Sequence, residues 1–356
     1  MTSEILFMGG FLLLVTLMLA VDLGLVNRKD HVVSFREAIV WTGIWIGMAL
    51  LFYLFIRLHA EWIHGITTFG QLEHFNAKHG HNITLDPALG FDANIEMYRR
   101  AMSLEYITGY LIEKALSVDN IFVMIMIFLG FRVDPRYYHK ILFWGIIGAV
   151  VMRFLFIFLS AALIQRFEWI LWIFGAVLVV TGVKMFLERN KKEEMDMKRH
   201  PVVRFVSKRF RMTRTDYGGR FFVRLRGMLY MTPLFLVLLI IEASDVIFAV
   251  DSIPAIFSVT LDPYIVFFSN IFAILGLRSL FFVLNSVVDK FAYLKTGLAA
   301  LLVFIGCKML LHGIFHIDIS TAASLLAIVG ILAASIAASL LFPPKKIYSK
   351  TISKRS

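Results

Sequence analysis

The apolar residues of this chain are gathered into blocks of about twenty residues, and this pattern constrains the fold more than any other feature. A helix of that length crosses the hydrocarbon core of a bilayer, which is about 30 Å thick. The sequence therefore predicts an all-α, polytopic membrane protein. The predicted membrane spans, about nine in number, cover residues 5–26, 36–57, 106–130, 139–163, 168–187, 230–259, 264–287, 292–312 and 320–342.

The polar stretches of the chain are too short to form a separate soluble core. The chain enters its first apolar block almost at once, with Glu4 and no basic leader, so we expect that block to remain a span rather than a cleaved signal peptide. We divide the chain into five parts: two spans with an outer loop that bears histidines (1–100), a first three-helix unit (101–187), a basic cytoplasmic loop (188–228), a second three-helix unit (229–313), and a last span with a basic tail (314–356).

Basic residues predict the orientation in the membrane. They gather in the first, third and fifth loops and in the tail: Arg28, Lys29 and Arg36; Arg132, Arg136 and Lys140; thirteen Lys or Arg between positions 189 and 226; and Lys345, Lys346, Lys350, Lys354 and Arg355. With nine spans all these segments lie on one side, which the positive-inside rule assigns to the cytoplasm. The N-terminus is then outside and the C-terminus is cytoplasmic.

Several classes of function find no support in the sequence. The net charge of +11 is concentrated in cytoplasmic loops, where topology and anionic lipid account for it, so we expect a lipid bilayer and no nucleic acid as a partner. Cys307 is the single cysteine, which excludes an intrachain disulfide and a thiolate metal cluster. No serine-nucleophile, phosphate-loop or HExxH motif appears, so we expect no enzyme and no permanently bound cofactor. Residues 202–226 are predicted as a basic surface helix or a solvated loop.

An acidic motif occurs twice within apolar segments. The first copy is Glu113-x5-Asp119-Asn120-Ile121, and the second is Asp245-x5-Asp251-Ser252-Ile253. An ionised carboxylate costs at least about 2.5 kcal/mol at the centre of a membrane helix. A chain that keeps four of them is expected to use them on an ion or proton path.

The two copies belong to a longer internal repeat. Aligning them brings Asp134-Pro135 near Asp262-Pro263 and Arg153 near Arg278, and it places Gly182-Val183-Lys184-Met185 on Gly306-Cys307-Lys308-Met309. The repeat thus covers three consecutive spans in each half. Because three is odd, the second copy enters the membrane from the opposite side, which predicts an inverted repeat of two three-helix units. Many transporters have this architecture, with the substrate site between the halves.

Pro254 predicts an interruption in the second copy. It lacks an amide hydrogen, and its ring clashes with the carbonyl of Val250, so we expect a kink or break beside Asp251 that leaves a carbonyl free to bind metal. Phe122 aligns with Pro254 in the first copy, so the halves need not be equivalent. The alternative is that Pro254 merely kinks a packed helix.

The spacing of the motif decides which side chains share a helix face. Positions seven apart nearly coincide, whereas positions six apart differ by about 240°. Glu113 and Asn120 are therefore on one face, and Asp119 lies to one side. Two facing copies, with Glu242 preceding Asp245, could surround one cation with oxygen ligands, which suit Mg, Ca or Mn. The predicted metal ligands are Glu113, Asp119, Asn120, Glu242, Asp245, Asp251 and Ser252.

A structural alternative is that these acids form buried ion pairs. Intramembrane charges commonly pair with one another. Arg153 and Arg278 lie near the middle of their predicted spans and must find partners or water. The candidate charge partners are Arg153, Arg278 and Lys308, with Lys114 and Lys184 as further basic residues. Asp22 and Asn270 are secondary candidates, since each could lie at a membrane interface.

Histidines are concentrated in the predicted outer loop. They are His59, His64, His74, His79 and His81, accompanied by Glu61, Glu73, Asp86 and Asp92, and a second outer loop contributes His312 and His316. Imidazoles would favour zinc or copper if they converged. Their irregular spacing matches no zinc motif, so the sequence does not predict a metal site here.

At residues 113–122 and 245–257, and at the Gly-x-Lys-Met span ends, the sequence resembles the TerC family of integral membrane proteins, which includes the Alx-like manganese exporters. The resemblance runs over most of the chain. It implies nine spans with an inverted pair of three-helix repeats, and manganese efflux with links to tellurite resistance. It also implies that Glu113, Asp119, Asp245 and Asp251, with Asn120, form a metal path. Tyr110 aligns with Glu242, which therefore lacks an acidic counterpart.

The leading hypothesis is a transporter of the bacterial inner membrane that exports Mn(II) by alternating access. Burial favours the neutral carboxylic acid and a bound cation favours the carboxylate, so proton coupling is expected. A second hypothesis is a non-transporting scaffold in a stress-resistance, tellurite-resistance or protein-insertion complex, which docks through residues 187–227. A third is an intramembrane hydrolase with Asp119 and Asp251 as its catalytic pair. The sequence identifies no protein partner.

Overall fold

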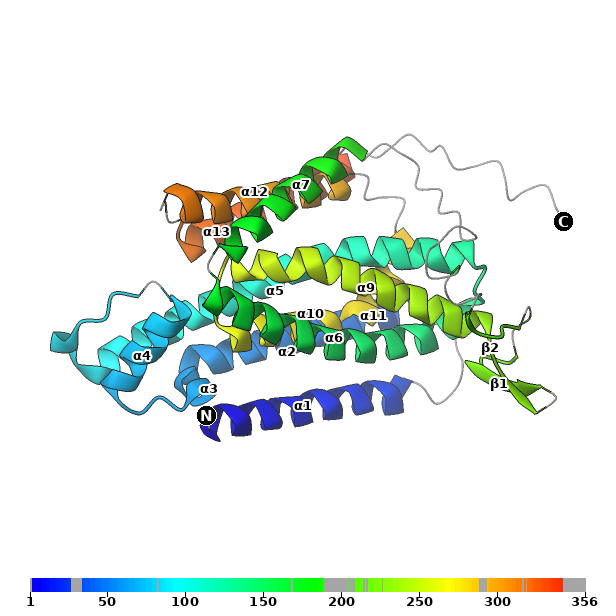
Figure 1. The fold of residues 1–356 in the computed structure, drawn as a ribbon, viewed down its shortest axis with the longest axis horizontal. Helices are drawn as coiled ribbons and strands as arrows, with labels where there is room; N and C mark the ends of the chain where they lie inside the picture. Colours follow the sequence, from blue (N-terminus) through cyan, green and yellow to red (C-terminus); the bar gives the residue numbers. More distant parts are fainter. Residues whose placement is uncertain are drawn as a thin grey trace.

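The computed structural model of the protein is built almost entirely of helices (Figure 1). It describes residues 2–26, 34–81, 83–167, 169–188, 204, 209–213, 215, 217–225, 227–287, 293–315, 317 and 319–341. The helices are α1 (Thr2–Val26), α2 (Phe35–His59), α3 (Glu61–His64), α4 (Phe69–His79), η1 (Pro87–Leu89), α5 (Gly90–Gly130), η2 (Pro135–Tyr137), α6 (Tyr138–Arg166), α7 (Ile170–Glu188), α9 (Pro233–Phe257), α10 (Pro263–Leu275), α11 (Leu277–Val287), α12 (Leu294–Phe315) and α13 (Thr321–Leu341). Strands β1 (Phe222–Leu225) and β2 (Met228–Met231) form an antiparallel hairpin.

Seven helices within the described ranges are long and apolar enough to cross a membrane, which confirms an all-α, polytopic membrane protein. They are α1, α2, α6, α7, α9, α12 and α13. Helices α10 and α11 add one broken candidate span, because they bend by 45° at Gly276. The remaining predicted span, 106–130, lies within the 41-residue helix α5, which carries Glu113, Lys114 and Asp119. The total of nine spans remains a prediction.

The long helices lie roughly side by side (Figure 1). Helices α2, α5, α6, α9, α10 and α11 form the centre of the bundle, with α1 along one side. On the other side α7, α12 and α13 form a group that also contacts α5 and α9. Helices α3 and α4 cover one end of the bundle, and the β-hairpin lies at the opposite end.

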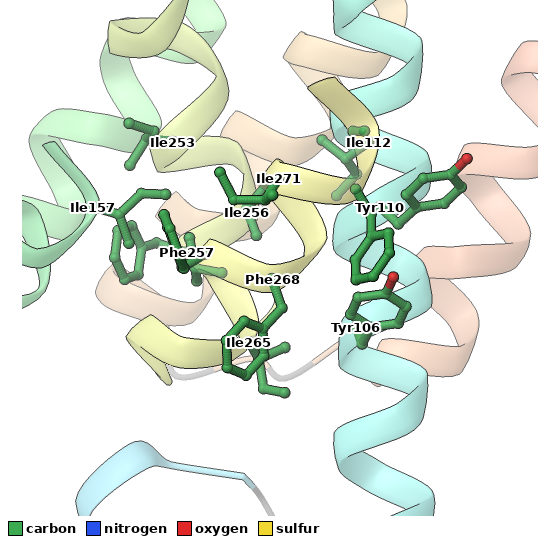
Figure 2. Close-up of a cluster of buried hydrophobic side chains, with 14 of the residues drawn as sticks. Tyr106, Tyr110, Ile112, Ile157, Ile253, Ile256, Phe257, Ile265, Phe268 and Ile271 are labelled. Carbon is green, nitrogen blue, oxygen red and sulfur yellow. The ribbon is translucent and has the colours of Figure 1, made fainter. Parts of the chain in front are cut away.

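Buried apolar side chains hold the centre of the bundle together (Figure 2). The cluster contains Tyr106 and Ile112 of α5, Ile157 of α6, Phe257 of α9 and Phe268 of α10. Close packing of these large side chains fixes the helices that carry the acidic motif relative to one another.

Two Asp-Pro pairs begin helices at corresponding places in the chain. The side chains of Asp134 and Asp262 accept hydrogen bonds from the backbone amides of Arg136 and Tyr264, at 3.0 and 2.9 Å. In each pair the proline follows at the first helical position, where its missing amide hydrogen costs no hydrogen bond. This sequence signal thus sets the starts of η2 and α10.

The predicted break beside Asp251 is wrong. Helix α9 continues through Pro254 and ends at Phe257, so the helix is not broken there, and a kink at Pro254 stays a prediction. The interruption instead lies at Gly276, between α10 and α11. A Cβ atom there would lie 3.1 Å from Cβ of Trp45 and 2.8 Å from Nζ of Lys114, so the close approach of α2 and α5 favours glycine.

The predicted surface helix over residues 202–226 is also wrong at its C-terminal end. Residues Phe222–Leu225 form strand β1, and much of the preceding segment lies outside the described residues. The ring of Phe222 packs against Phe235 at the start of α9, with ring centroids 4.4 Å apart. Lys140 of α6 donates a hydrogen bond to the carbonyl of Gly219 at 2.7 Å. The hairpin therefore docks on the ends of α6 and α9.

Candidate functional site

Arg153 is the centre of a buried polar cluster inside the bundle. It lies on α6, its side chain is 1% exposed, and it donates to the carboxylate of Glu113 on α5. Its Nη2 atom lies 3.6 Å from Oδ1 of Asp245 on α9, and its Nη1 atom donates to Oδ1 of Asn270 on α10. The cluster therefore joins both acidic motifs through one guanidinium group, as the structural alternative anticipates.

The cluster also contains polar atoms without partners. Among the described residues, Oε2 of Glu113, Oδ2 of Asp245, Oγ of Ser252 and Nε of Arg153 are buried and make no hydrogen bond. Ser252 lies beside Glu113. An unpartnered buried polar group costs about 1–3 kcal/mol. Three of these atoms are oxygens, so a water molecule or a hard cation would satisfy them.

Asp119 and Asp251 are less buried than the other residues of the two motifs. Both are half-buried, whereas Glu113, Asn120, Asp245 and Ser252 are buried. The seven-residue spacing explains the buried set, and the six-residue spacing turns each second aspartate to the side. Oγ1 of Thr181 on α7 donates to Oδ1 of Asp251 at 3.3 Å. The structure thus divides the predicted ligands into a buried group and a half-buried group.

Glu242 faces a small cavity beside the cluster. Asp245 and Arg278 line the same cavity, together with apolar residues of α5, α6 and α9. The carboxylate of Glu242 lies against Gly148 of α6, and a Cβ atom at that position would overlap it. Nη1 of Arg278 lies 3.0 Å from Nε2 of His139. Glu242 and Asp245 therefore line one space, although Glu242 lies outside the contacts of Arg153.

The predicted basic partners have different surroundings. Lys114 is not ion-paired with the cluster but donates to the carbonyl oxygen of Ala273 at 3.3 Å, close to the break between α10 and α11. Lys308 is buried on α12, whereas Lys184 is exposed on α7. Arg153 contacts both acidic motifs directly, through Glu113 and Asp245.

Several polar residues around the site are not indicated by the acidic motifs in the sequence. Asn270 was a secondary candidate, but it is fully buried and bonded to Arg153. Thr181 and His139 were not predicted to contact charged residues. A buried amide in an apolar segment is a weak signal, because its partner is known only once the helices are placed.

Comparison with known proteins identifies the family of the chain. Residues 98–346 match the integral membrane protein TerC family. An uncharacterised membrane protein of Myxococcus xanthus is 44% identical over 94% of this chain and 91% of its own length. A protein of Escherichia coli K12, whose name describes a candidate membrane-bound redox modulator, Alx, is 44% identical over 91% of each chain. An uncharacterised membrane protein of Rickettsia felis is 37% identical over 93% of this chain and 96% of its own.

No solved structure matches the chain. The match to residues 98–346 covers both acidic motifs, all the helices of the buried cluster, and more than half of the chain. The expected resemblance is therefore confirmed, and the chain belongs to the TerC family of integral membrane proteins.

Proposed function

We propose that this protein is a divalent-cation transporter of the bacterial inner membrane that exports Mn(II) by alternating access in exchange for protons. The observation that carries the proposal is the buried cluster in which Glu113 and Asp245, from the two acidic motifs, share Arg153. Carboxylate and hydroxyl oxygens without partners lie in the same place. Such hard oxygen donors suit Mn(II).

Two helix contacts support the inverted repeat. The alignment equates Gly182 with Gly306 and Gly175 with Ala299. A Cβ atom at Gly182 would lie 2.8 Å from the carbonyl oxygen of Ala299, and one at Gly306 would lie 2.7 Å from that of Gly175. Replacing each residue by its aligned counterpart therefore turns the Gly182–Ala299 contact into the Gly306–Gly175 contact. This relation is expected when two equivalent helices, here α7 and α12, pack about a two-fold axis. With nine spans and the basic loops in the cytoplasm, the N-terminus is outside in this proposal.

Arg153 gives the site a way to change its charge. In the structure its guanidinium compensates both Glu113 and Asp245. A divalent cation that binds these carboxylates takes over that role, and Arg153 must then move away or lose part of its bonding. Protons compete with the cation for the same oxygens. Arg153, the divalent cation and protons thus compete for the same pair of carboxylates. This competition is the basis for exchanging the cation for protons.

Asp119 and Asp251 extend the path from this centre. They occur once in each motif and are half-buried, so they are more accessible than Glu113 and Asp245. We assign to them the role of passing the cation between the buried centre and water, with Asn120 and Ser252 as uncharged oxygen ligands nearby in the sequence. Glu242 lines the adjacent cavity and provides a further carboxylate.

Ion flux into proteoliposomes of the purified full-length protein tests this function. Mn, Mg, Ca, Zn and Fe are compared under imposed pH gradients, for the wild type, Glu113→Gln, Asp245→Asn and the double variant of Asp119 and Asp251 to Asn. Asp134→Asn is the matched control, because its carboxylate lies in an exposed turn and asparagine is an equally good N-cap. We expect Mn flux that is retained in the control and lost in the motif variants.

Absence of flux for every ion, from folded protein, would refute transport and favour the scaffold hypothesis. Deletion of residues 188–228 separates the two functions: a transporter retains flux without that loop, whereas a scaffold that docks through it loses its partner.

A further inference from the structure

A second group of metal-binding side chains lies at the end of the bundle that carries α3 and α4. His64 and His79 are the last residues of these two helices, and each is followed by a glycine with a left-handed backbone, Gly65 and Gly80. One ligand atom each of His64, His79 and Asp262 lies within 4.8 Å of the others. All three side chains are buried. The fold thus brings together two imidazoles and a carboxylate that are far apart in the sequence.

His64 is held in place by carboxylates on both sides. Its Nδ1 atom lies 3.0 Å from Oε1 of Glu4, and its Nε2 atom lies 2.8 Å from Oδ2 of Asp262. The other oxygen of Asp262 accepts the capping hydrogen bond from Tyr264. A carboxylate on the second ring nitrogen is the usual support of a metal-binding histidine, because it fixes the ring and raises its basicity. Glu4 supplies that support, which directs Nε2 of His64 towards Asp262.

His79 is the second and independent observation that points to a ligand. Its side chain is 1% exposed, and within the described part of the chain neither ring nitrogen has a hydrogen-bond partner. An imidazole in this environment can offer a ring nitrogen as a ligand to a metal ion. A buried polar group in this state costs about 1–3 kcal/mol, which a bound cation would offset.

His81 lies next to His79 at the edge of this group. Its Nδ1 atom lies 3.0 Å from Oε2 of Glu105, and its buried Nε2 atom has no partner among the described residues. Its ring centroid is 5.9 Å from that of His79. The pairing with Glu105 repeats the support that Glu4 gives to His64.

We propose that His64, His79 and Asp262 form a binding site for a divalent transition-metal ion, with zinc as its occupant. Two imidazoles and one carboxylate are a frequent zinc ligand set, and imidazole favours zinc over manganese or magnesium. Ligands at about 2.0–2.2 Å in tetrahedral geometry lie about 3.3 Å apart, so Nε2 of His64 and Oδ2 of Asp262 need to separate by about 0.5 Å. The ion takes the place of the proton between them.

This site is distinct from the proposed transport path. His64 and His79 precede the TerC match at residues 98–346, and their donors are imidazoles rather than hard oxygens. The ion would join α3 and α4 to the turn that begins α10. Asn270, which accepts a hydrogen bond from Arg153, lies on the same helix eight residues after Asp262, a rise of about 12 Å. A metal ion at this site would therefore link α3 and α4, which cover one end of the bundle, to α10, which contributes Asn270 to the Arg153 cluster.

The test is zinc binding to metal-stripped, full-length protein in detergent, measured by competition with a chromophoric chelator. Variants His79→Gln and His64→Gln remove ligands, and Glu4→Gln removes the support of His64. His74→Gln is the matched control, because His74 is exposed on the same helix, α4. The double variant of Asp119 and Asp251 to Asn keeps this site while it alters the transport path. Mn(II) is titrated as the second metal.

We expect one zinc ion per chain that binds more tightly than manganese in the wild type, in His74→Gln and in the Asp119/Asp251 variant. Glu4→Gln should weaken zinc by about 10–100-fold, and either histidine variant should weaken it further. Equal zinc affinity in His79→Gln and wild type would overturn the proposal. If the histidine variants fail to fold, X-ray absorption of zinc-loaded wild type decides: imidazole scattering supports the site, and coordination by oxygen alone refutes it.

Discussion

The buried Arg153 cluster and the histidine site both place carboxylates around a nitrogen-bearing side chain, but they differ in the groups that lack partners among the described residues. In the first, the guanidinium of Arg153 lies between Glu113 and Asp245, and the groups without partners include three oxygens. In the second, they include both ring nitrogens of His79. In the first site the side chain of Arg153 already compensates the carboxylates, and a metal ion would have to replace it. In the second site the ring nitrogens of His79 are available to a metal ion that prefers nitrogen ligands.

In our two proposals, this difference in donor atoms assigns a different metal ion to each site. Hard oxygen donors bind Mn(II) weakly enough to release it, which transport requires. Imidazole donors with supporting carboxylates hold zinc strongly, which suits a structural site. The two sites also differ in location, since the oxygen site joins the long helices α5, α6 and α9, whereas His64 and His79 end the short helices α3 and α4, which cover one end of the bundle (Figure 1).

The largest expected effect is that of Arg153→Met. It leaves Glu113 and Asp245 buried without their cation, and breaking a buried pair costs about 3–5 kcal/mol. We expect the detergent-solubilised protein to melt at a markedly lower temperature and to lose flux. Arg136→Met, in an exposed turn, should leave both unchanged. Adding Glu113→Gln to Arg153→Met should restore part of the stability. An unaltered melting temperature in Arg153→Met would show that the guanidinium is not the central cation.

Measuring Mn flux and zinc affinity in variants of both sites tests whether the two sites are independent. Asp245→Asn should lower Mn flux at least about tenfold and leave zinc affinity within about twofold, because changes at well-separated sites are nearly additive. His79→Gln should do the reverse. Both quantities are measured on one preparation of each variant. A loss of zinc affinity in Asp245→Asn would mean that the two sites are a single coupled system.

A smaller effect is expected from Gly148→Ala, which tests whether Glu242 belongs to the transport path. The added methyl group overlaps the carboxylate of Glu242, and overpacking of this kind costs about 1–3 kcal/mol when the neighbour cannot move. We expect reduced Mn flux and unchanged zinc binding. Gly330→Ala on α13 is the control, because no atom lies within 4 Å of its added Cβ atom. Normal flux in Gly148→Ala would remove Glu242 from the path.

The sequence predicted the elements of this protein better than their contacts. Apolar blocks and Asp-Pro pairs depend on local physics, so α6, α9 and α10 begin where the patterns indicate. The break at Gly276 was not predicted, because only the packing of Trp45 and Lys114 favours glycine there.

The candidate sites show the same limit. Carboxylates in apolar segments are conspicuous, so Glu113 and Asp245 were found. The partners His64 and Asp262 are 198 positions apart in the chain, and both occur in polar connections where such residues are common. Only the folded chain brings them together.

The smallest predicted effect concerns Thr181 and distinguishes the two parts of the transport path. Its hydroxyl donates to Asp251 at 3.3 Å, a long bond to a half-buried carboxylate, so its loss should cost no more than about 1 kcal/mol. Thr181→Val keeps the shape of the side chain and removes the donor. We expect Mn flux to change less than about tenfold, with no change in melting temperature. Thr16→Val serves as the control, because that exposed hydroxyl bonds to the backbone of its own helix. A loss of flux as large as that of Asp245→Asn would place Asp251 in the rate-determining site, whereas a small change leaves the Arg153 cluster as the centre where the cation and protons compete.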